Sequence, residues 1–334
     1  MTLSLEHKSI TKQSRLVALD YTRAFAILLV VIGHWDPEPE PEWWYQCVKT
    51  IYTFHMPLFL AISGYLYMYT WKQRNYINLL LGKFKRLMIP YFFTSVIIIT
   101  IKLLSQNACY VEHPTTIYSY FEALYYPSAG YFLWFMWALW WMFVIIPFFK
   151  SRNTRTILFF ISIGLHFIPW NAPDIFCLRQ TQLMLVYFMA GIMLFDWKQL
   201  FTTDTKLQAA ILGVLFIILE TIYLAGTEWV SFILAFISII LFPALFKIIE
   251  PCISKSQHRI LMTISSASFI IYLFHTTVEG FVKSFAQPLL APGNEIVYAL
   301  LIIIAGAAGT TIPIWLTVKI LSRWKITRWM FGLK

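Results

Sequence analysis

The chain has 334 residues, of which 59% are hydrophobic and only 13% are charged, whereas soluble domains carry roughly 25% charged residues. This composition excludes an ordinary soluble domain and indicates a polytopic membrane protein. The net charge of +10 does not indicate a nucleic-acid partner, because the basic residues lie in short loops between apolar runs and follow membrane topology.

Long apolar runs predict an all-α fold, a polytopic transmembrane helical bundle of about ten spans, since a helix needs about 20 apolar residues to cross a bilayer. The predicted spans are residues 19–35, 50–70, 87–104, 131–149, 156–170, 183–195, 207–225, 229–247, 266–286 and 296–321. We therefore divide the chain into an N-terminal tail, 1–18, a transmembrane domain, 19–321, and a C-terminal tail, 322–334.

The charges of the connecting loops predict the orientation of the bundle. Most of the 26 lysines and arginines lie in the two tails and in alternate loops, whereas the other loops are acidic. By the positive-inside rule, we expect both termini in the cytoplasm. The chain is then a multi-pass protein of the cell membrane, that is, the inner or plasma membrane, surrounded by membrane lipids.

Three polar residues in the first span, Asp20, Arg23 and His34, are the most informative in the chain. A charge inside a bilayer costs a few kcal/mol or more, so such residues usually line a polar path or a site. Arg23 and His34 are eleven positions apart, which places them on nearly the same helix face and about 16 Å apart along the axis. Asp20 precedes Arg23 by three positions, so the two can form an ion pair.

The second span and the loop after it contain further candidates. We expect His55 at a depth close to that of His34, where two imidazoles could share acid–base work, although a histidine bonded to water at the interface is the alternative. Ser63 and the adjacent Gly64 allow close approach of a helix or a ligand, and helix packing is the favoured explanation. Arg86, at the start of the third span, is either a topology signal or a phosphate-binding residue.

Aromatic and histidine residues mark two later spans. Trp134 and Trp137 belong to an aromatic cluster that an interfacial belt explains, with stacking on a sugar as the alternative. His275 lies midway in the ninth predicted span, and Glu279 follows one turn later. We expect a hydrogen bond between His275 and Glu279, because an unpaired polar group at mid-membrane is unfavourable.

Other catalytic motifs are missing from the sequence. There is no phosphate-binding glycine loop with Lys and Ser or Thr, no His-Glu-x-x-His helix and no Gly-x-Ser-x-Gly turn. The four cysteines have no metal-binding spacing, although Cys47–Cys109 and Cys109–Cys177 disulfides would suit an oxidising compartment. We therefore predict no metal site, and any chemistry has to come from the polar residues within the membrane.

Four stretches carry a family resemblance: Leu19-Asp20-Tyr-Thr-Arg23, with His34 after ten intervening residues; Phe54-His55-Met-Pro57-Leu-Phe-Leu-Ala-Ile-Ser63-Gly64-Tyr65; Trp134-Phe-Met-Trp137-Ala-Leu; and Ile271-Tyr272-Leu-Phe-His275. With them the chain resembles the integral membrane acyltransferase family 3, which O-acylates sugars of surface polysaccharides and other extracytoplasmic acceptors. His34 matches the catalytic histidine of that family and Arg23 the arginine of the same motif. Ser63, Trp134 and His275 match positions that recur in the family.

The resemblance implies transfer of an acyl group from cytoplasmic acyl-CoA to a hydroxyl of an extracytoplasmic glycan or lipid-linked sugar. Acetyl-CoA is the favoured donor, with succinyl-CoA left open, and it acts as a co-substrate beside no permanently bound cofactor. His34 would take the hydroxyl proton or carry the acyl group briefly. Arg23 and Arg86 would position the donor and hold its phosphates, while His55 and His275 would orient His34 or the acceptor.

Two other functions remain open from the sequence. Buried Arg, His and Glu residues also build the pathways of transporters, which move a small solute or a lipid-linked sugar without covalent chemistry. A membrane scaffold, in which polar residues serve only helix association, is the third interpretation. It explains the alignment of Arg23 and His34 poorly.

Overall fold

A computed structural model describes residues 16–70, 75–108, 111, 113–197, 205–290 and 293–333 of the chain. The described part consists of helices joined by turns and loops and contains no strand, as the predicted all-α fold requires. Most of the predicted N-terminal tail, 1–18, lies outside the described residues. So does Cys109, which takes part in both predicted disulfides, and Cys47, Cys177 and Cys252 carry free thiols.

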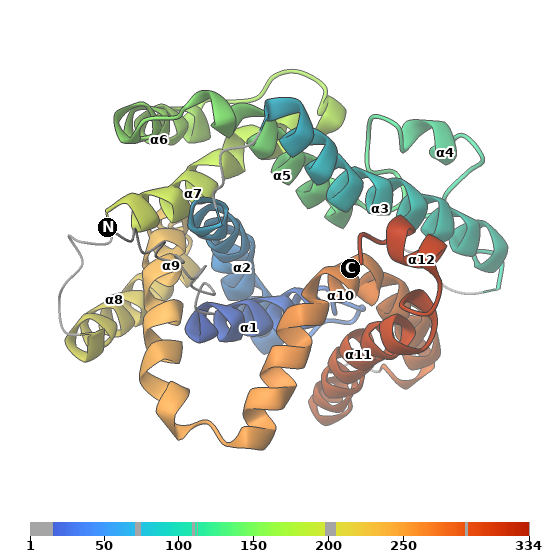
Figure 1. Ribbon diagram of the computed structural model, residues 1–334. Helices are drawn as coiled ribbons and strands as arrows, with labels where there is room; N and C mark the ends of the chain where they lie inside the picture. The colour runs from blue at the N-terminus through green and yellow to red at the C-terminus, as the bar shows by residue number, and fades with distance from the viewer. Residues whose placement is uncertain are drawn as a thin grey trace, which may run out of the picture.

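A helix stands at each of the ten predicted span positions (Figure 1). The α-helices are α1 (Val17–Gly33), α2 (Glu42–Tyr69), α3 (Tyr76–Ser105), α4 (Ser119–Glu122), α5 (Trp134–Ile145), α6 (Arg152–Phe167), α7 (Leu178–Asp196), α8 (Thr205–Leu224), α9 (Val230–Ile249), α10 (Lys255–Ala286), α11 (Glu295–Leu316) and α12 (Lys325–Met330). Short 3-10 segments extend several of them, including η1 (Tyr131–Leu133) before α5 and η3 (Ile175–Cys177) before α7.

Seven of the described helices are long and apolar enough to cross a membrane, which makes the chain a multi-pass membrane protein. They are α3, α5, α7, α8, α9, α10 and α11 with their short extensions. The predicted number of about ten spans is not confirmed. Helices α1 and α6 have 17 and 16 residues, and α2, with 28 residues, is long enough but includes polar residues such as His55 and Ser63 along its length.

Helices α2 and α7 touch backbone to backbone in the middle of the bundle. A Cβ atom added to Gly64 of α2 would lie 2.0 Å from the carbonyl oxygen of Phe188, and one added to Gly191 of α7 would lie 1.9 Å from that of Ala61. No real Cβ can occupy either position, so both glycines are required by the close approach. Helix packing, the favoured explanation for Gly64, is therefore correct.

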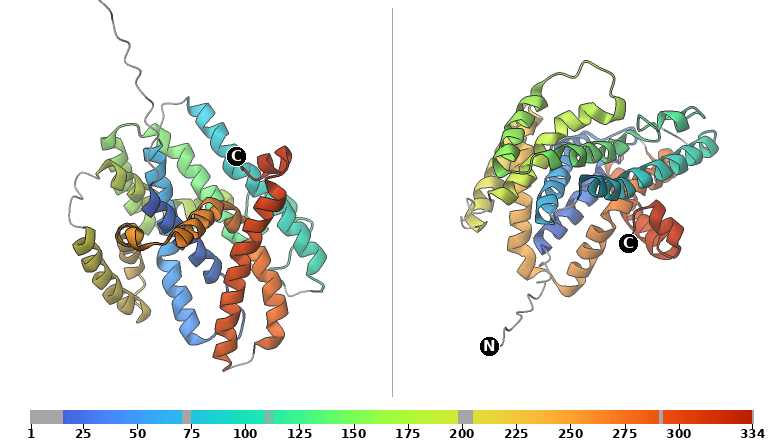
Figure 2. Two further views of the ribbon diagram at one scale, coloured as in Figure 1. Left: turned by 60° about the horizontal axis from the view of Figure 1, so that its bottom comes forward. Right: turned by 45° about the horizontal axis from the view of Figure 1, so that its top comes forward.

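Helix α1 lies inside the bundle, between α10, α2, α9 and α11 (Figure 1). Its buried side chains include Ala24, Ile27, Val30 and Val31. Because neighbours surround the helix, polar groups along it face protein rather than lipid. The two further views in Figure 2 show the C-terminal segment lying beside the middle of α3, where Trp329 of α12 packs against Phe93. Residues 322–334, predicted as a tail, thus include a short helix.

Candidate active site

A cavity of about 490 Å³ opens at the end of α1 that bears His34. Helices α1, α2, α3, α5, α7 and α10 all contribute to its wall, together with the loops next to them. The lining includes His34, Tyr52, His55, Phe132, Trp134 and Glu279. We call it the histidine cavity.

His34 follows the last residue of α1, where its own backbone N–H still bonds to the carbonyl of Val31 at 3.2 Å. Its imidazole is surrounded by aromatic rings. The ring centroid of His275 lies 5.1 Å away and that of Phe132 6.4 Å away, and the Tyr52 hydroxyl is 3.3 Å from Nδ1 of His34. The helix end thus presents the imidazole to the cavity within a fixed frame.

The other two histidines of this region are buried and held by their own helices. His55 Nδ1 is 2.8 Å from the carbonyl oxygen of Ile51, and His275 Nδ1 is 2.8 Å from that of Tyr272. A carbonyl oxygen only accepts, so Nδ1 carries the proton in both rings, and in the neutral form Nε2 carries the lone pair. His55, expected at a depth close to that of His34, lines the same cavity, and the ring of His275 packs on the ring of His34.

The hydrogen bond expected between His275 and Glu279 is absent, and that prediction was wrong. His275 Nε2 and both carboxyl oxygens of Glu279 have no hydrogen-bond partner among the described residues. The imidazole turns back to the carbonyl oxygens of Ile271 and Tyr272 instead. Glu279 lies against α11, where its Oε1 would be 3.0 Å from a Cβ atom on Gly309.

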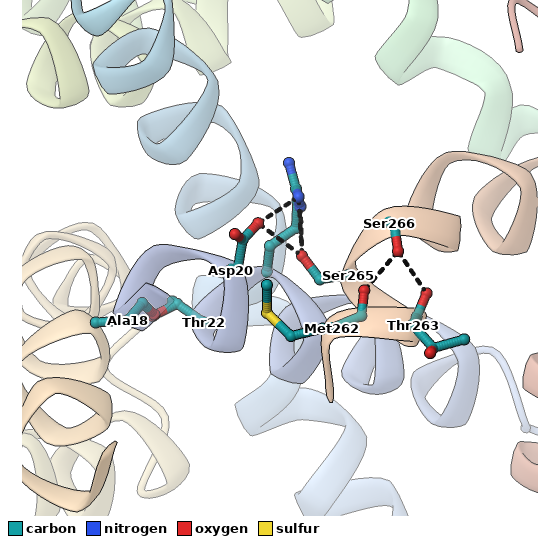
Figure 3. A network of polar contacts seen from close by, with 8 residues as sticks. Ala18, Asp20, Thr22, Met262, Thr263, Ser265 and Ser266 are labelled. Atoms are coloured by element: carbon teal, nitrogen blue, oxygen red, sulfur yellow. Dashed lines mark hydrogen bonds and ion pairs between the residues drawn. The ribbon is translucent and has the colours of Figure 1, made fainter. Parts of the chain in front are cut away.

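Arg23 forms a separate polar network near the other end of α1 with Asp20 and Ser265, the two partners that Figure 3 labels. It donates to Asp20 Oδ1 at 2.6 Å and to the Ser265 hydroxyl at 2.8 Å, and that hydroxyl donates to Asp20 at 3.0 Å. The predicted pair of Asp20 and Arg23 is thus present. Ser265, from α10, was not predicted, because its contact with Arg23 joins residues 242 positions apart.

The histidine cavity reaches His34 but not Arg23. Among the residues of α1, Val30 is the one nearest to Arg23 that still lines the cavity. Ala24 and Ile27, which lie between Arg23 and Val30, are fully packed. The two polar positions that the sequence places on one helix face therefore belong to two sites, separated by a buried stretch of α1.

The remaining predicted residues divide between cavity, core and surface. Trp134 lines the histidine cavity, whereas Trp137 is buried against the rings of Tyr91 and Phe176. Ser63 donates to the carbonyl of Phe59 in its own helix at 2.9 Å. Arg86 is exposed on α3 and does not line the cavity.

Charged residues that the sequence did not single out complete the rim of the cavity. Lys283 of α10 forms an ion pair with Asp36, just after α1, and both line the cavity. Lys102 Nζ donates to the carbonyl of His113 at 3.2 Å, and these two residues also line it.

The loop between α1 and α2, to which Asp36 belongs, also carries a carboxyl group with an altered pKa. Burial and the nearby carboxylates of Asp36 and Glu38 raise the pKa of Glu40 to about 7. Within the described part of the chain, no group of three His, Cys, Asp or Glu residues is arranged to hold a metal ion.

Two curated relatives each match about a quarter of the chain. The nodulation protein NolL of Sinorhizobium fredii (strain NBRC 101917 / NGR234) is 35% identical over 95 residues, which is 27% of this chain and 26% of that protein. The nodulation protein NolL of Mesorhizobium japonicum (strain LMG 29417 / CECT 9101 / MAFF 303099) is 32% identical over 94 residues, or 27% and 25% of the two chains. The match thus spans about a quarter of each relative. No solved structure matches the chain.

The family model gives far wider coverage than these relatives. The model described as an acyltransferase domain matches residues 16–318, which include every helix from α1 to α11. The chain therefore belongs to the acyltransferase 3 family.

Proposed function

We propose that the chain is a membrane O-acyltransferase of the cell membrane that moves an acyl group, with acetyl favoured, from cytoplasmic acyl-CoA to a hydroxyl of an extracytoplasmic glycan or lipid-linked sugar. The observation that carries the proposal is the position of His34. It lines a cavity large enough for a small ligand and lies beside two further histidines, in a chain of an acyltransferase family.

The chemistry requires a base and room for two substrates. The acceptor oxygen attacks the thioester carbonyl carbon, His34 takes the hydroxyl proton, the carbon–sulfur bond breaks, and the proton passes to the leaving thiolate of CoA. In the tautomer whose Nδ1–H donates to the Tyr52 hydroxyl oxygen, His34 Nε2 carries the lone pair that takes this proton. Tyr52 and the packed ring of His275 then fix the orientation of the base.

The donor is proposed to arrive from the Arg23 end. Asp20 and Ser265 hold the guanidinium of Arg23 in place, where it can position a group of the donor. Because the cavity ends at Val30, the acyl group can reach His34 along α1 only if side chains around Ile27 move. Arg86, exposed on α3, remains available to the phosphates of CoA.

The test uses membranes that contain the full chain, labelled acetyl-CoA and surface glycan isolated from a strain that lacks the chain. We expect label in the glycan and a loss of transfer of about 100-fold or more in His34→Ala, since a positioned base contributes typically 10²–10⁴-fold. His166→Ala is the control, because His166 bonds to the carbonyl of Leu183 away from the cavity. Unchanged transfer by His34→Ala would contradict the assignment, and solute uptake without transfer would favour a transporter.

A further inference from the structure

Several buried polar atoms on one stretch of α10 lack partners. Among the described residues, Thr277 Oγ1 and both carboxyl oxygens of Glu279 have no hydrogen-bond partner. Both residues line the histidine cavity, and Glu279 is only 1% exposed. A buried polar group without a partner is unfavourable, so such groups in a cavity wall point to a ligand-binding role.

Neither Thr277 nor Glu279 forms the hydrogen bond or ion pair that is common for its residue type at such a position in a helix. A threonine in a helix usually donates to the carbonyl one turn back, as Thr263 does to Arg259 at 2.8 Å in the same helix. Thr277 does not. Lys283, one turn after Glu279, forms its ion pair with Asp36 and not with Glu279. The carboxyl oxygens of Glu279, a residue of the cavity wall, therefore have no hydrogen-bond partner among the described residues.

The packing of α11 provides the space for Glu279. A Cβ atom on Gly309 would lie 3.0 Å from Glu279 Oε1 and 2.8 Å from a methyl carbon of Val31. Glycine at this position lets the carboxyl group lie between α10 and α11 beside α1. The buried acid is thus accommodated by its neighbours without being bonded by them.

We propose that Glu279, assisted by Thr277, binds a second hydroxyl of the acceptor and so selects a polyol such as a sugar. This inference rests on the acyl transfer proposed above. A carboxyl oxygen accepts a hydrogen bond from a substrate hydroxyl, and the threonine hydroxyl can donate to or accept from another. Both atoms then gain the partner that the protein does not supply.

The position of Glu279 relative to His34 suits this role. Glu279 lies one helical turn, about 6 Å along the axis, beyond His275, whose ring is 5.1 Å from that of His34. An acceptor hydroxyl at His34 and a second hydroxyl at Glu279 therefore fall within one small ligand. Glu279 is a positioning residue for the acceptor, and the proposal assigns it no contact with the donor.

The experiment measures acceptor kinetics with the full chain in membranes. Glycan from a strain that lacks the chain is varied at saturating labelled acetyl-CoA, and acetyl-CoA is then varied at saturating glycan. For Glu279→Ala we expect the KM for glycan to rise at least about tenfold, because the acceptor loses a hydrogen bond and its hydroxyl is left unpaired in a buried site, while the KM for acetyl-CoA changes less than about twofold. Glu279→Gln keeps one acceptor oxygen, so its KM for glycan should lie between those of the wild type and Glu279→Ala.

A stability measurement separates this role from a structural one. Since Glu279 has no partner in the described protein, Glu279→Gln should keep or raise the thermal midpoint of the purified chain in detergent. The control Glu295→Gln changes an exposed carboxylate at the start of α11 and should alter neither KM.

The outcomes distinguish this inference from the proposed function. If the wild-type chain transfers no label, both fail together. If it transfers label and Glu279→Ala retains the wild-type KM for glycan, only the acceptor subsite is overturned. A lowered thermal midpoint in Glu279→Gln, with both KM values raised equally, would likewise overturn it in favour of a structural role.

Discussion

At the scale of single residues, the local part of the site could be predicted from the sequence and the distant part could not. The pair of Asp20 and Arg23 follows from a spacing of three in a helix. The bond from Arg23 to Ser265 and the ion pair of Asp36 and Lys283 join residues 242 and 247 positions apart. Only the packing of α1 against α10 brings them together, and no local pattern indicates it.

The failed prediction for His275 has a physical reason. A histidine and a glutamate four positions apart can meet, but each also has other ways to lie. His275 bonds to carbonyl oxygens of the preceding turn, and Glu279 fills the space that Gly309 leaves. The sequence pattern indicates which residues lie near one another on a helix. It does not indicate which of them form a hydrogen bond.

Ser265 provides a residue-scale test of the Arg23 network. Ser265→Ala removes the hydroxyl that accepts from Arg23, and we expect the KM for acetyl-CoA to rise roughly 3- to 10-fold because the guanidinium is less firmly held. The neighbouring Ser266→Ala is a matched control, since Ser266 bonds only to carbonyls within α10 (Figure 3). Equal effects of the two variants on that KM would argue against a donor-positioning role.

At the scale of helices, the positions of the helices were predicted well because apolar composition is a local property. The limits of α2 were not, since it begins at Glu42 rather than near residue 50. Its first turns carry Glu42, Gln46 and Lys49. These residues are too polar to be predicted as part of a membrane span, although they belong to the same helix. A span prediction that depends on hydropathy therefore misses the polar end of a helix.

The contact of α2 with α7 gives a sharp prediction at this scale. Gly191→Ala should lower the free energy of unfolding by more than about 3 kcal/mol, because its methyl group would meet a backbone carbonyl that cannot turn aside. Gly164→Ala and Gly213→Ala face open space and should be neutral or slightly stabilising. Thermal unfolding of the purified chain in detergent measures all three, and a midpoint for Gly191→Ala equal to that of the controls would refute the packing argument.

At the scale of the whole molecule, the histidine cavity and the Arg23 network lie at different depths of the bundle. The proposed reaction needs these sites to face opposite sides of the membrane. That orientation rests on the distribution of charge in the loops and remains a prediction.

Natural cysteines allow the orientation to be tested without new mutations. Cys47 is exposed near the start of α2, on the side of the histidine cavity, and Cys252 is exposed between α9 and α10, on the other side. A membrane-impermeant maleimide should label Cys47 in spheroplasts, whose cell membrane is intact. It should label Cys252 only after that membrane is permeabilised. Mass spectrometry of the labelled peptides identifies each site, with buried Cys177 as the unlabelled control. The reverse pattern would invert the proposed topology.

The glycine contact between α2 and α7 also determines which half of the bundle is free to rearrange during a reaction cycle. Carbonyl oxygens block any sliding of α2 along α7, whereas Gly306 and Gly309 of α11 face side-chain methyl groups of α1, which can rotate. A passage that connects Arg23 to His34 would run along α1 beside α10, which contacts Arg23 through Ser265 and His34 through His275. If a thioester passes along α1, we expect the transient opening among α1, α10 and α11, whereas His55 belongs to α2, which is in backbone contact with α7.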